Sequence, residues 1–394
     1  MGVLRTSEWQ KLPMSLNELC INTTLRCGQT FRWRQSPSSE WSIALHGRIL
    51  SLRQDASHLH YRTVSPSLPT SNKTPLPSQS LDKDDTVPLL HHYFNLTPHL
   101  PSLYAHWSAL DPHFRRLAPR FTGVRILQQD AWEALVGFIC SSNNHISRIS
   151  SMVEKLCTHF GTLIGEVDGV KYFDFPEPKA LAGEGVEGRL RELGFGYRAG
   201  YLWKTAKVVD ERGVRWLEGL RNPEAWGSGA STMAEGGREG YRTAHEALLT
   251  LAGVGPKVAD CVCLMGLGWG EAVPVDTHVW QIAQRDYRFG KRGQKSLTKG
   301  TYDAVANMFR GLWGSEAGWA HSVLFTADLK AFAEKGREEG TVMEMKRITK
   351  EEETVVAKAL RRDSRKRSVV EDEEKVVTVK GEVVRRSKRR KQTG

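Results

Sequence analysis

Lys257 and Asp276 are two side chains that could act together in one cleft, because each lies at the start of a predicted helix. Asp276 precedes the helical pattern Val279, Ile282, Ala283, and aspartate is a preferred residue at helix N-termini. Lys257 begins a helical pattern of its own, beside free backbone N–H groups. The plainer interpretations are a solvated lysine and an aspartate that only caps its helix.

The segment LAGVGPKVADC at 251–261 predicts a helix, a tight Gly-Val-Gly hairpin and a second helix. Gly253 and Gly255 allow a sharp turn and a close approach to a ligand, and Pro256 suits the first position of a helix. The exposed N–H groups at the start of the second helix suit a phosphate. On its own, the motif is also compatible with a plain turn.

The segments LAGVGPKVADC and VPVDTHVW together resemble the helix-hairpin-helix DNA glycosylases, and within them the eukaryotic 8-oxoguanine DNA glycosylase/lyases. Other segments that resemble this family, in the same order, are CGQTFRW at 27–33, FICSSNNHISRI at 138–149, GFGYRAGY at 194–201, AQRDY at 283–287 and GWAHSVLF at 318–325. The resemblance covers residues 8–330. It implies a bifunctional DNA glycosylase and abasic-site lyase that removes 8-oxoguanine opposite cytosine in base excision repair.

The resemblance assigns the catalytic chemistry to Lys257 and Asp276. The neutral amine of Lys257 would attack the anomeric carbon, displace the base and form a Schiff base that permits β-elimination of the 3′ phosphate. Asp276 would stabilise positive charge on the sugar, and the base would first be flipped out of the duplex. Two alternatives stay open: a related glycosylase with another lesion preference, and a non-catalytic hairpin module that only binds DNA.

The resemblance places five residues around the flipped base: Gly28, Cys261, Pro274, His321 and Phe325. The Gly28 carbonyl would accept from the ring nitrogen that is a donor in 8-oxoguanine and an acceptor in guanine. Cys261 and Phe325 would sandwich the base, and Pro274 would line the pocket. The family has glutamine at position 321, so here a rigid imidazole with one donor and one acceptor would have to read the Watson–Crick edge.

Further residues match the family's contacts with the opposite strand and the DNA backbone. Asn143, Arg148 and Arg198 match readers of the estranged cytosine, whose acceptors and amino donor suit amide and guanidinium groups. Tyr197 matches a residue wedged beside the opened base pair. The other expected contacts with DNA are Gly253, Gly255, His278 and Gln294.

Three regions are predicted along the chain: an N-terminal antiparallel sheet domain at 1–125, a helix-hairpin-helix glycosylase domain at 126–330 and a disordered basic tail at 331–394. The fold class is α+β, with an all-α body and a sheet that in the family resembles the TATA-binding-protein fold. Residues 25–64 favour strands with a turn at His46-Gly47. The Ser-, Pro- and Gly-rich segments 65–86 and 222–240 predict loops.

A net charge of +11 favours a polyanionic partner, and we expect a monomer that binds damaged double-stranded DNA. Basic clusters at 361–367 and 385–391 predict nuclear import or non-specific DNA contacts, hence a nuclear protein, with a mitochondrial pool left open. The six cysteines form no CxxC pair, which favours a reducing compartment and predicts neither metal nor cofactor. No apolar run is long enough to predict a membrane span.

Overall fold

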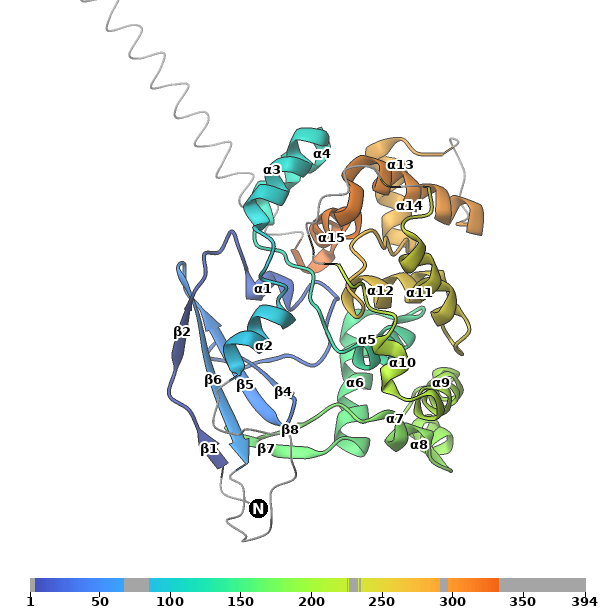
Figure 1. Ribbon diagram of the computed structural model, residues 1–394. Coiled ribbons are helices and arrows are strands. Elements are labelled where there is room, and N and C mark those ends of the chain that lie inside the picture. The colour runs from blue at the N-terminus through green and yellow to red at the C-terminus, as the bar shows by residue number, and fades with distance from the viewer. Residues whose placement is uncertain are drawn as a thin grey trace, which may run out of the picture. The chain divides into compact units, whose positions relative to one another are not determined.

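The computed structural model describes residues 4–66, 85–224, 226, 233, 235–290 and 297–332, all within one compact unit, Met1–Phe332 (Figure 1). The predicted tail at 331–394 lies outside the described residues, apart from its first two positions. The same holds for 67–84 and for much of the predicted loop at 222–240. Within the described part, no helix is both long and apolar enough to cross a membrane.

An antiparallel sheet forms the N-terminal part of the chain, as predicted. Its strands are β1 (Leu4–Thr6), β2 (Gln10–Pro13), β3 (Arg34–Gln35), β4 (Trp41–Leu45), β5 (Arg48–Gln54) and β6 (His58–Pro66). Their order is β1-β6-β5-β4-β3, and β2 also pairs with β6. β4 and β5 meet at the predicted His46-Gly47 turn, where φ values of 49° and 76° are those that a two-residue type I′ hairpin requires.

Residues 25–33 form no strand, so this part of the strand prediction for 25–64 was wrong. The segment follows α1 (Ile21–Thr24) as a loop that is held by the side chain of Gln29. The amide oxygen of Gln29 accepts from the Leu127 N–H at 3.0 Å, and its nitrogen donates to the Arg125 carbonyl at 2.8 Å. These partners come from a distant part of the chain, which a local alternation of apolar residues cannot reveal.

Helices make up most of the remaining chain. Their bounds are α2 (Thr86–Tyr93), α3 (Leu100–Leu110), α4 (Pro112–Leu117), α5 (Ala131–Ser141), α6 (Ile146–Phe160), α7 (Pro178–Ala182), α8 (Val186–Glu192), α9 (Arg198–Arg212), α10 (Val214–Glu218), α11 (Glu239–Leu249), α12 (Pro256–Met265), α13 (Thr277–Tyr287), α14 (Lys299–Trp313) and α15 (Ala317–Asp328). Short 3₁₀ turns are η1 (Ala118–Arg120), η2 (Gly314–Glu316) and η3 (Lys330–Phe332). The α+β class with a helical body is therefore confirmed.

The body also contains one β-hairpin that the sequence did not predict, β7 (Leu163–Val167) and β8 (Val170–Phe173). Ile164 and Tyr172 of the hairpin are buried in a small apolar cluster with Ile49 and Val64 of the sheet. The hairpin therefore covers apolar side chains of the N-terminal sheet and ties the helical body to it (Figure 1). Burial against this sheet, rather than local propensity, explains the strands.

Two further apolar cores hold the fold together. The larger core lies among the helices and includes fully buried Trp107, Trp313 and Trp319. The smaller one lies between the sheet and the helices α1 and α2, where Leu50 of β5 packs with Phe94. Each core is formed by residues that are distant in sequence. The N-terminal sheet and the helical body are held together by them, which places the loop at 27–33 against the helices that carry Lys257 and Asp276.

Candidate active site

The Gly-Val-Gly hairpin joins α11 to α12, as predicted. Gly253 has a φ of +80°, and a Cβ atom there would lie 2.7 Å from side-chain atoms of Tyr201. This position therefore requires glycine for both its backbone conformation and its packing. Gly255 has an extended conformation as the N-cap residue of α12, and Pro256 takes the first helical position. A missing side chain at Gly255 leaves the N–H groups at the start of α12 open to a ligand.

Lys257 lies in the first turn of α12 and is held by two residues of α5. Its Nζ donates to the Ser141 Oγ at 3.3 Å and lies 5.3 Å from the centre of the Phe138 ring. The Ser141 hydroxyl in turn donates to the Phe138 carbonyl at 2.7 Å. Both α5 residues fall within the matching segment FICSSNNHISRI, yet only the fold shows that they hold the amine.

Asp276 is the N-cap of α13, as the sequence predicts. Its carboxylate accepts from the Val279 N–H at 2.9 Å and is only partly buried. The segment that precedes it is buried, because Val273, Pro274 and Val275 pack inside the molecule. The carboxylate is therefore fixed by its own helix on one side and by a buried chain segment on the other.

One pocket brings together both predicted catalytic residues and all five predicted base-binding residues. It encloses about 440 Å³ of space, part of it open to solvent. The predicted residues that line it are Gly28, Lys257, Cys261, Pro274, Asp276, His321 and Phe325. Phe138, Met265 and Ser322 also line it and were not predicted. Among the described residues, no group of side chains has the arrangement of a metal site.

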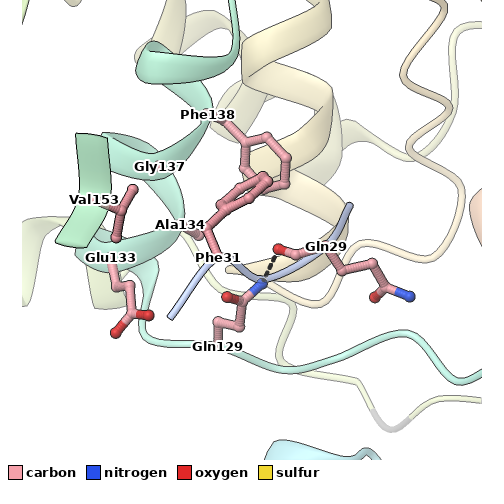
Figure 2. A pocket seen from close by; sticks show the side chains of 8 residues that line it. All are labelled: Gln29, Phe31, Gln129, Glu133, Ala134, Gly137, Phe138 and Val153. Carbon is pink, nitrogen blue, oxygen red and sulfur yellow. Dashed lines mark hydrogen bonds between the residues drawn. The ribbon is translucent and has the colours of Figure 1, made fainter. Parts of the chain in front are cut away.

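The Gly28 loop reaches this pocket from the sheet side. Gly28 has a φ of +85°, and a Cβ atom there would lie 3.3 Å from Ile146 and 4.0 Å from Phe325. The side chain of Gln129, just before α5, donates to the Gln29 carbonyl at 2.8 Å, as Figure 2 shows. Phe31 of the same loop packs edge-on against Phe138, with ring centres 5.7 Å apart (Figure 2). The loop is therefore anchored to α5.

Cys261 and Phe325 both line the pocket. Cys261 contributes a buried thiol, and Phe325 contributes a partly exposed ring. Cys261 is buried, and burial raises the pKa of its thiol to about 11, although the nearby Lys257 opposes this shift. The thiol is therefore neutral near pH 7 and can serve as an apolar contact surface. The Phe325 ring lies 6.1 Å from the ring of His278 and 6.3 Å from that of His321.

His321 is only 4% exposed, and both of its ring nitrogens are buried without a hydrogen bond of normal geometry. Burial lowers the pKa of His321 to about 4, and the Asp276 carboxylate and the Gly318 carbonyl offset this only in part. The ring is therefore neutral near pH 7, with one donor and one acceptor. Buried polar groups without partners are rare, so a pair of them beside a pocket indicates a place for a polar ligand.

Three of the residues predicted to contact the opposite strand lie together, namely Asn143, Tyr197 and Arg198, and the fourth, Arg148, is separate. Arg198 is buried, and its guanidinium donates to the carbonyls of Ser142 and Asn143. Tyr197 is 51% exposed and donates to the Ser142 carbonyl at 3.2 Å. Asn143 is exposed with a φ of 47°, and Arg148 is exposed in the first turn of α6. Arg198 and Tyr197, at the start of α9, thus hold the α5–α6 loop that presents Asn143 to solvent.

Two predicted DNA contacts remain. His278 is exposed near the start of α13, and its Nδ1 lies 3.7 Å from a carboxylate oxygen of Asp328. Gln294 lies outside the described residues. His278 thus lies beside Phe325, which lines the pocket.

This fold and this site are those of a helix-hairpin-helix DNA glycosylase. The antiparallel sheet joins a helix-hairpin-helix body, and one pocket contains both a lysine of the hairpin helix and a capping aspartate. Family models agree: residues 11–135 match the N-terminal domain of 8-oxoguanine DNA glycosylase, and residues 136–305 match the HhH-GPD superfamily of base excision DNA repair proteins. The chain is 36% identical over 376 residues to the N-glycosylase/DNA lyase of Saccharomyces cerevisiae, covering 89% of this chain and 94% of that protein.

A second relative, N-glycosylase/DNA lyase OGG1 of Arabidopsis thaliana, is 35% identical over 334 residues, which cover 83% of this chain and 82% of the relative. The chain therefore belongs to the eukaryotic 8-oxoguanine DNA glycosylase/lyase family and is a DNA N-glycosylase with DNA lyase activity. The solved structure of MBOgg1 with a low-affinity DNA ligand shares the fold at a TM-score of 0.63 and 24% identity, covering 86% of this chain and 99% of that one.

Proposed function

We propose that this enzyme excises 8-oxoguanine opposite cytosine. The observation that carries the proposal is the single pocket lined by Lys257, Asp276 and the five residues expected around the base. The names of the relatives support it, as does a solved structure with the same fold: a Clostridium acetobutylicum 8-oxoguanine glycosylase/lyase bound to double-stranded DNA with cytosine opposite 8-oxoguanine (TM-score 0.61, 23% identity, 78% of this chain and 91% of that one).

The proposed reaction begins with the damaged nucleotide flipped into the pocket. The unprotonated Nζ of Lys257 attacks the anomeric carbon, and the bond to the base breaks with its electron pair leaving on the base, which then takes up a proton. Ring opening of the sugar gives a Schiff base on Lys257, and loss of a neighbouring proton expels the 3′ phosphate. The Ser141 hydroxyl and the Phe138 ring hold the amine at the pocket before attack.

Asp276 acts in this scheme as a fixed negative charge. Positive charge develops on the sugar while the bond to the base breaks, and a carboxylate held in place beforehand stabilises that charge without reorganising. The bond from the Val279 N–H supplies this fixed orientation. Lys257 and Asp276 line the same pocket, so the nucleophile and the stabilising charge reach the same sugar.

Base recognition is assigned to Gly28 and His321. The Gly28 carbonyl accepts from the ring N–H of 8-oxoguanine, whereas in guanine it meets a lone pair. The neutral His321 ring offers its two unpaired nitrogens to the Watson–Crick edge. Cys261 and Phe325 contact the faces of the base, and Pro274 closes the wall. Losing one buried hydrogen bond costs about 1–3 kcal/mol, so no single contact supplies the whole selectivity.

On the opposite strand, Asn143, Arg148 and Arg198 read the estranged cytosine, and Tyr197 occupies the opened stack. Asn143 and Arg148 are exposed, whereas Arg198 is buried and also holds the carbonyls of the Asn143 loop, which supports a rigid reading surface. Gly253 and Gly255 bring the start of α12 close to a phosphate, and His278 contacts the backbone. Gln294 keeps its proposed DNA contact as a sequence prediction.

Single-turnover excision on a panel of duplexes tests this function. The panel carries 8-oxoguanine, guanine or another oxidised base opposite each of the four bases. We expect 8-oxoguanine to be released at least about tenfold faster than guanine, and cytosine to be preferred over the other opposite bases by a similar factor. Faster release of a different lesion would instead support a related glycosylase, an alternative that His321 in place of glutamine favours.

We also propose that the basic clusters at 361–367 and 385–391 direct the chain to the nucleus and add non-specific DNA contacts. Truncation after Phe332, which keeps the whole compact unit and its buried last residue, should leave excision within about twofold, reduce nuclear accumulation and make non-specific binding less salt-dependent, since fewer phosphates are neutralised. Fluorescence microscopy of the two forms and binding at several salt concentrations measure these effects. Unchanged localisation with an unchanged salt slope contradicts both roles.

A further inference from the structure

Asp260 is a fully buried carboxylate on α12, one helical turn after Lys257, and it has no role in the proposed reaction. Its two oxygens accept hydrogen bonds from two tyrosines. Tyr241 of α11 donates to Oδ1, and Tyr302 of α14 donates to Oδ2. A buried carboxylate is tolerated only where hydrogen bonds compensate for lost hydration, so this cluster is a fixed point on the helix that carries Lys257.

The Tyr302 hydroxyl also bonds to the chain segment that precedes Asp276, which the Tyr241 hydroxyl does not. Its oxygen accepts a hydrogen bond from the Val275 N–H at 3.3 Å, while its O–H group donates a hydrogen bond to Asp260. A phenol can do both at once, because it has one donor and free lone pairs. Val275 directly precedes Asp276. One buried oxygen therefore connects the helix of the nucleophile to the chain segment that ends in the catalytic carboxylate.

The surrounding side chains hold this connection rigid. Arg310 donates to the Tyr241 hydroxyl at 3.0 Å and to the Glu271 carbonyl at 3.0 Å, just upstream of the Val275 segment. His245 lies 3.7 Å from Asp260 Oδ1. Tyr302 and Val275 are both buried, so water does not replace their bond.

We propose that Tyr302 is a positioning residue that sets the separation of Lys257 and Asp276 through the chain Asp260, Tyr302 and Val275. The inference rests on the roles proposed above for Lys257 and Asp276. Reacting groups lose rate when they are displaced by a fraction of their contact distance, because the bound geometry no longer matches the transition state. Tyr302 touches no substrate and acts only through the two elements that it joins.

The test compares Tyr302→Phe with Tyr241→Phe in the full-length chain. Each substitution removes one hydroxyl from Asp260 and one further bond: Tyr302→Phe removes the partner of the Val275 N–H, whereas Tyr241→Phe removes the acceptor of the Arg310 guanidinium and leaves the Val275 bond in place. The measurements are melting temperature, DNA affinity, single-turnover excision of 8-oxoguanine, and lyase cleavage of a preformed abasic site. All are made at a temperature below the melting points of both variants. Asp276 assists departure of the base, and no base departs from an abasic site.

Tyr302→Phe should slow excision about fivefold to tenfold with unchanged DNA affinity, and should slow cleavage of the preformed abasic site by less than about twofold. Tyr241→Phe should leave excision within about twofold, even where its melting temperature falls as far. Equal losses in both variants, or no loss in Tyr302→Phe, would overturn the proposal. Lys257→Gln serves as a separate arm: if that variant still nicked damaged DNA, the proposed reaction would fail, independently of the result for Tyr302.

Discussion

Lys257→Gln should abolish strand nicking and the adduct that borohydride traps on damaged duplex, while damaged-DNA binding stays within about threefold. Glutamine has no basic amine, so neither attack on the sugar nor the Schiff base can occur. It still reaches toward the Ser141 hydroxyl, so we expect the fold to persist. The rate loss should be at least about a thousandfold, equivalent to about 4 kcal/mol of transition-state stabilisation. Gel assays of nicking and trapping measure it.

The matched control is Lys204→Gln, since Lys204 is an exposed lysine of α9 outside the pocket. It should retain nicking and trapping. Asp276→Asn supplies a second arm, because asparagine caps a helix about as well as aspartate but carries no charge. It should slow release of the base more than cleavage of a preformed abasic site. Full cleavage by Lys257→Gln would remove the lysine from the mechanism.

His321→Ala should slow excision of 8-oxoguanine about tenfold or more at pH 7. The variant leaves polar atoms of the base edge unpaired in a buried pocket, at a cost of about 1–3 kcal/mol. His321→Gln should stay within about threefold of the unchanged enzyme, because an amide also offers one donor and one acceptor. Single-turnover rates on 8-oxoguanine opposite cytosine measure both. Equal rates for alanine and histidine would show that His321 does not read the base.

The pH dependence follows from the burial of this ring. An unperturbed histidine would lose its acceptor near pH 6.5, but burial lowers the pKa of His321 to about 4, so the readout should persist to about pH 5. The unfolded chain binds this proton near pH 6.5 and the folded chain near 4, so stability falls as pH drops between these values. The loss is about 3 kcal/mol for this residue. Denaturant unfolding should show it in the natural chain and not in His321→Gln.

Much of the fold prediction depended on the backbone preferences of residues at turns and helix starts. Gly253, Pro256 and Asp276 occupy a turn, a first helical position and an N-cap, and each place depends on backbone geometry within a few residues. The hairpin, the two helices after it and the turn at His46-Gly47 could therefore be predicted from the sequence. The same holds for the order of an antiparallel sheet followed by helices.

Long-range contacts decided what the local pattern could not. Residues 25–33 alternate like a strand but form a loop, because Gln29 bonds to Arg125 and Leu127 from a distant segment. The hairpin β7-β8 forms where Ile164 and Tyr172 can be buried against the sheet. Neither outcome is encoded by spacing in the chain, since the stabilising partner lies about one hundred residues away in each case.

The sequence by itself determined the chemistry available to this protein: a lysine and a carboxylate at two helix starts, with a histidine where the family has glutamine. Only the tertiary structure decided how these groups are held, and that burial keeps the His321 ring neutral near pH 7. It placed Ser141 and Phe138 against the amine, buried the ring of His321 without partners, and joined the segments that carry Lys257 and Asp276 through Tyr302. The physical reason is that desolvation and hydrogen bonding depend on which distant residues surround a group, and folding alone sets that environment.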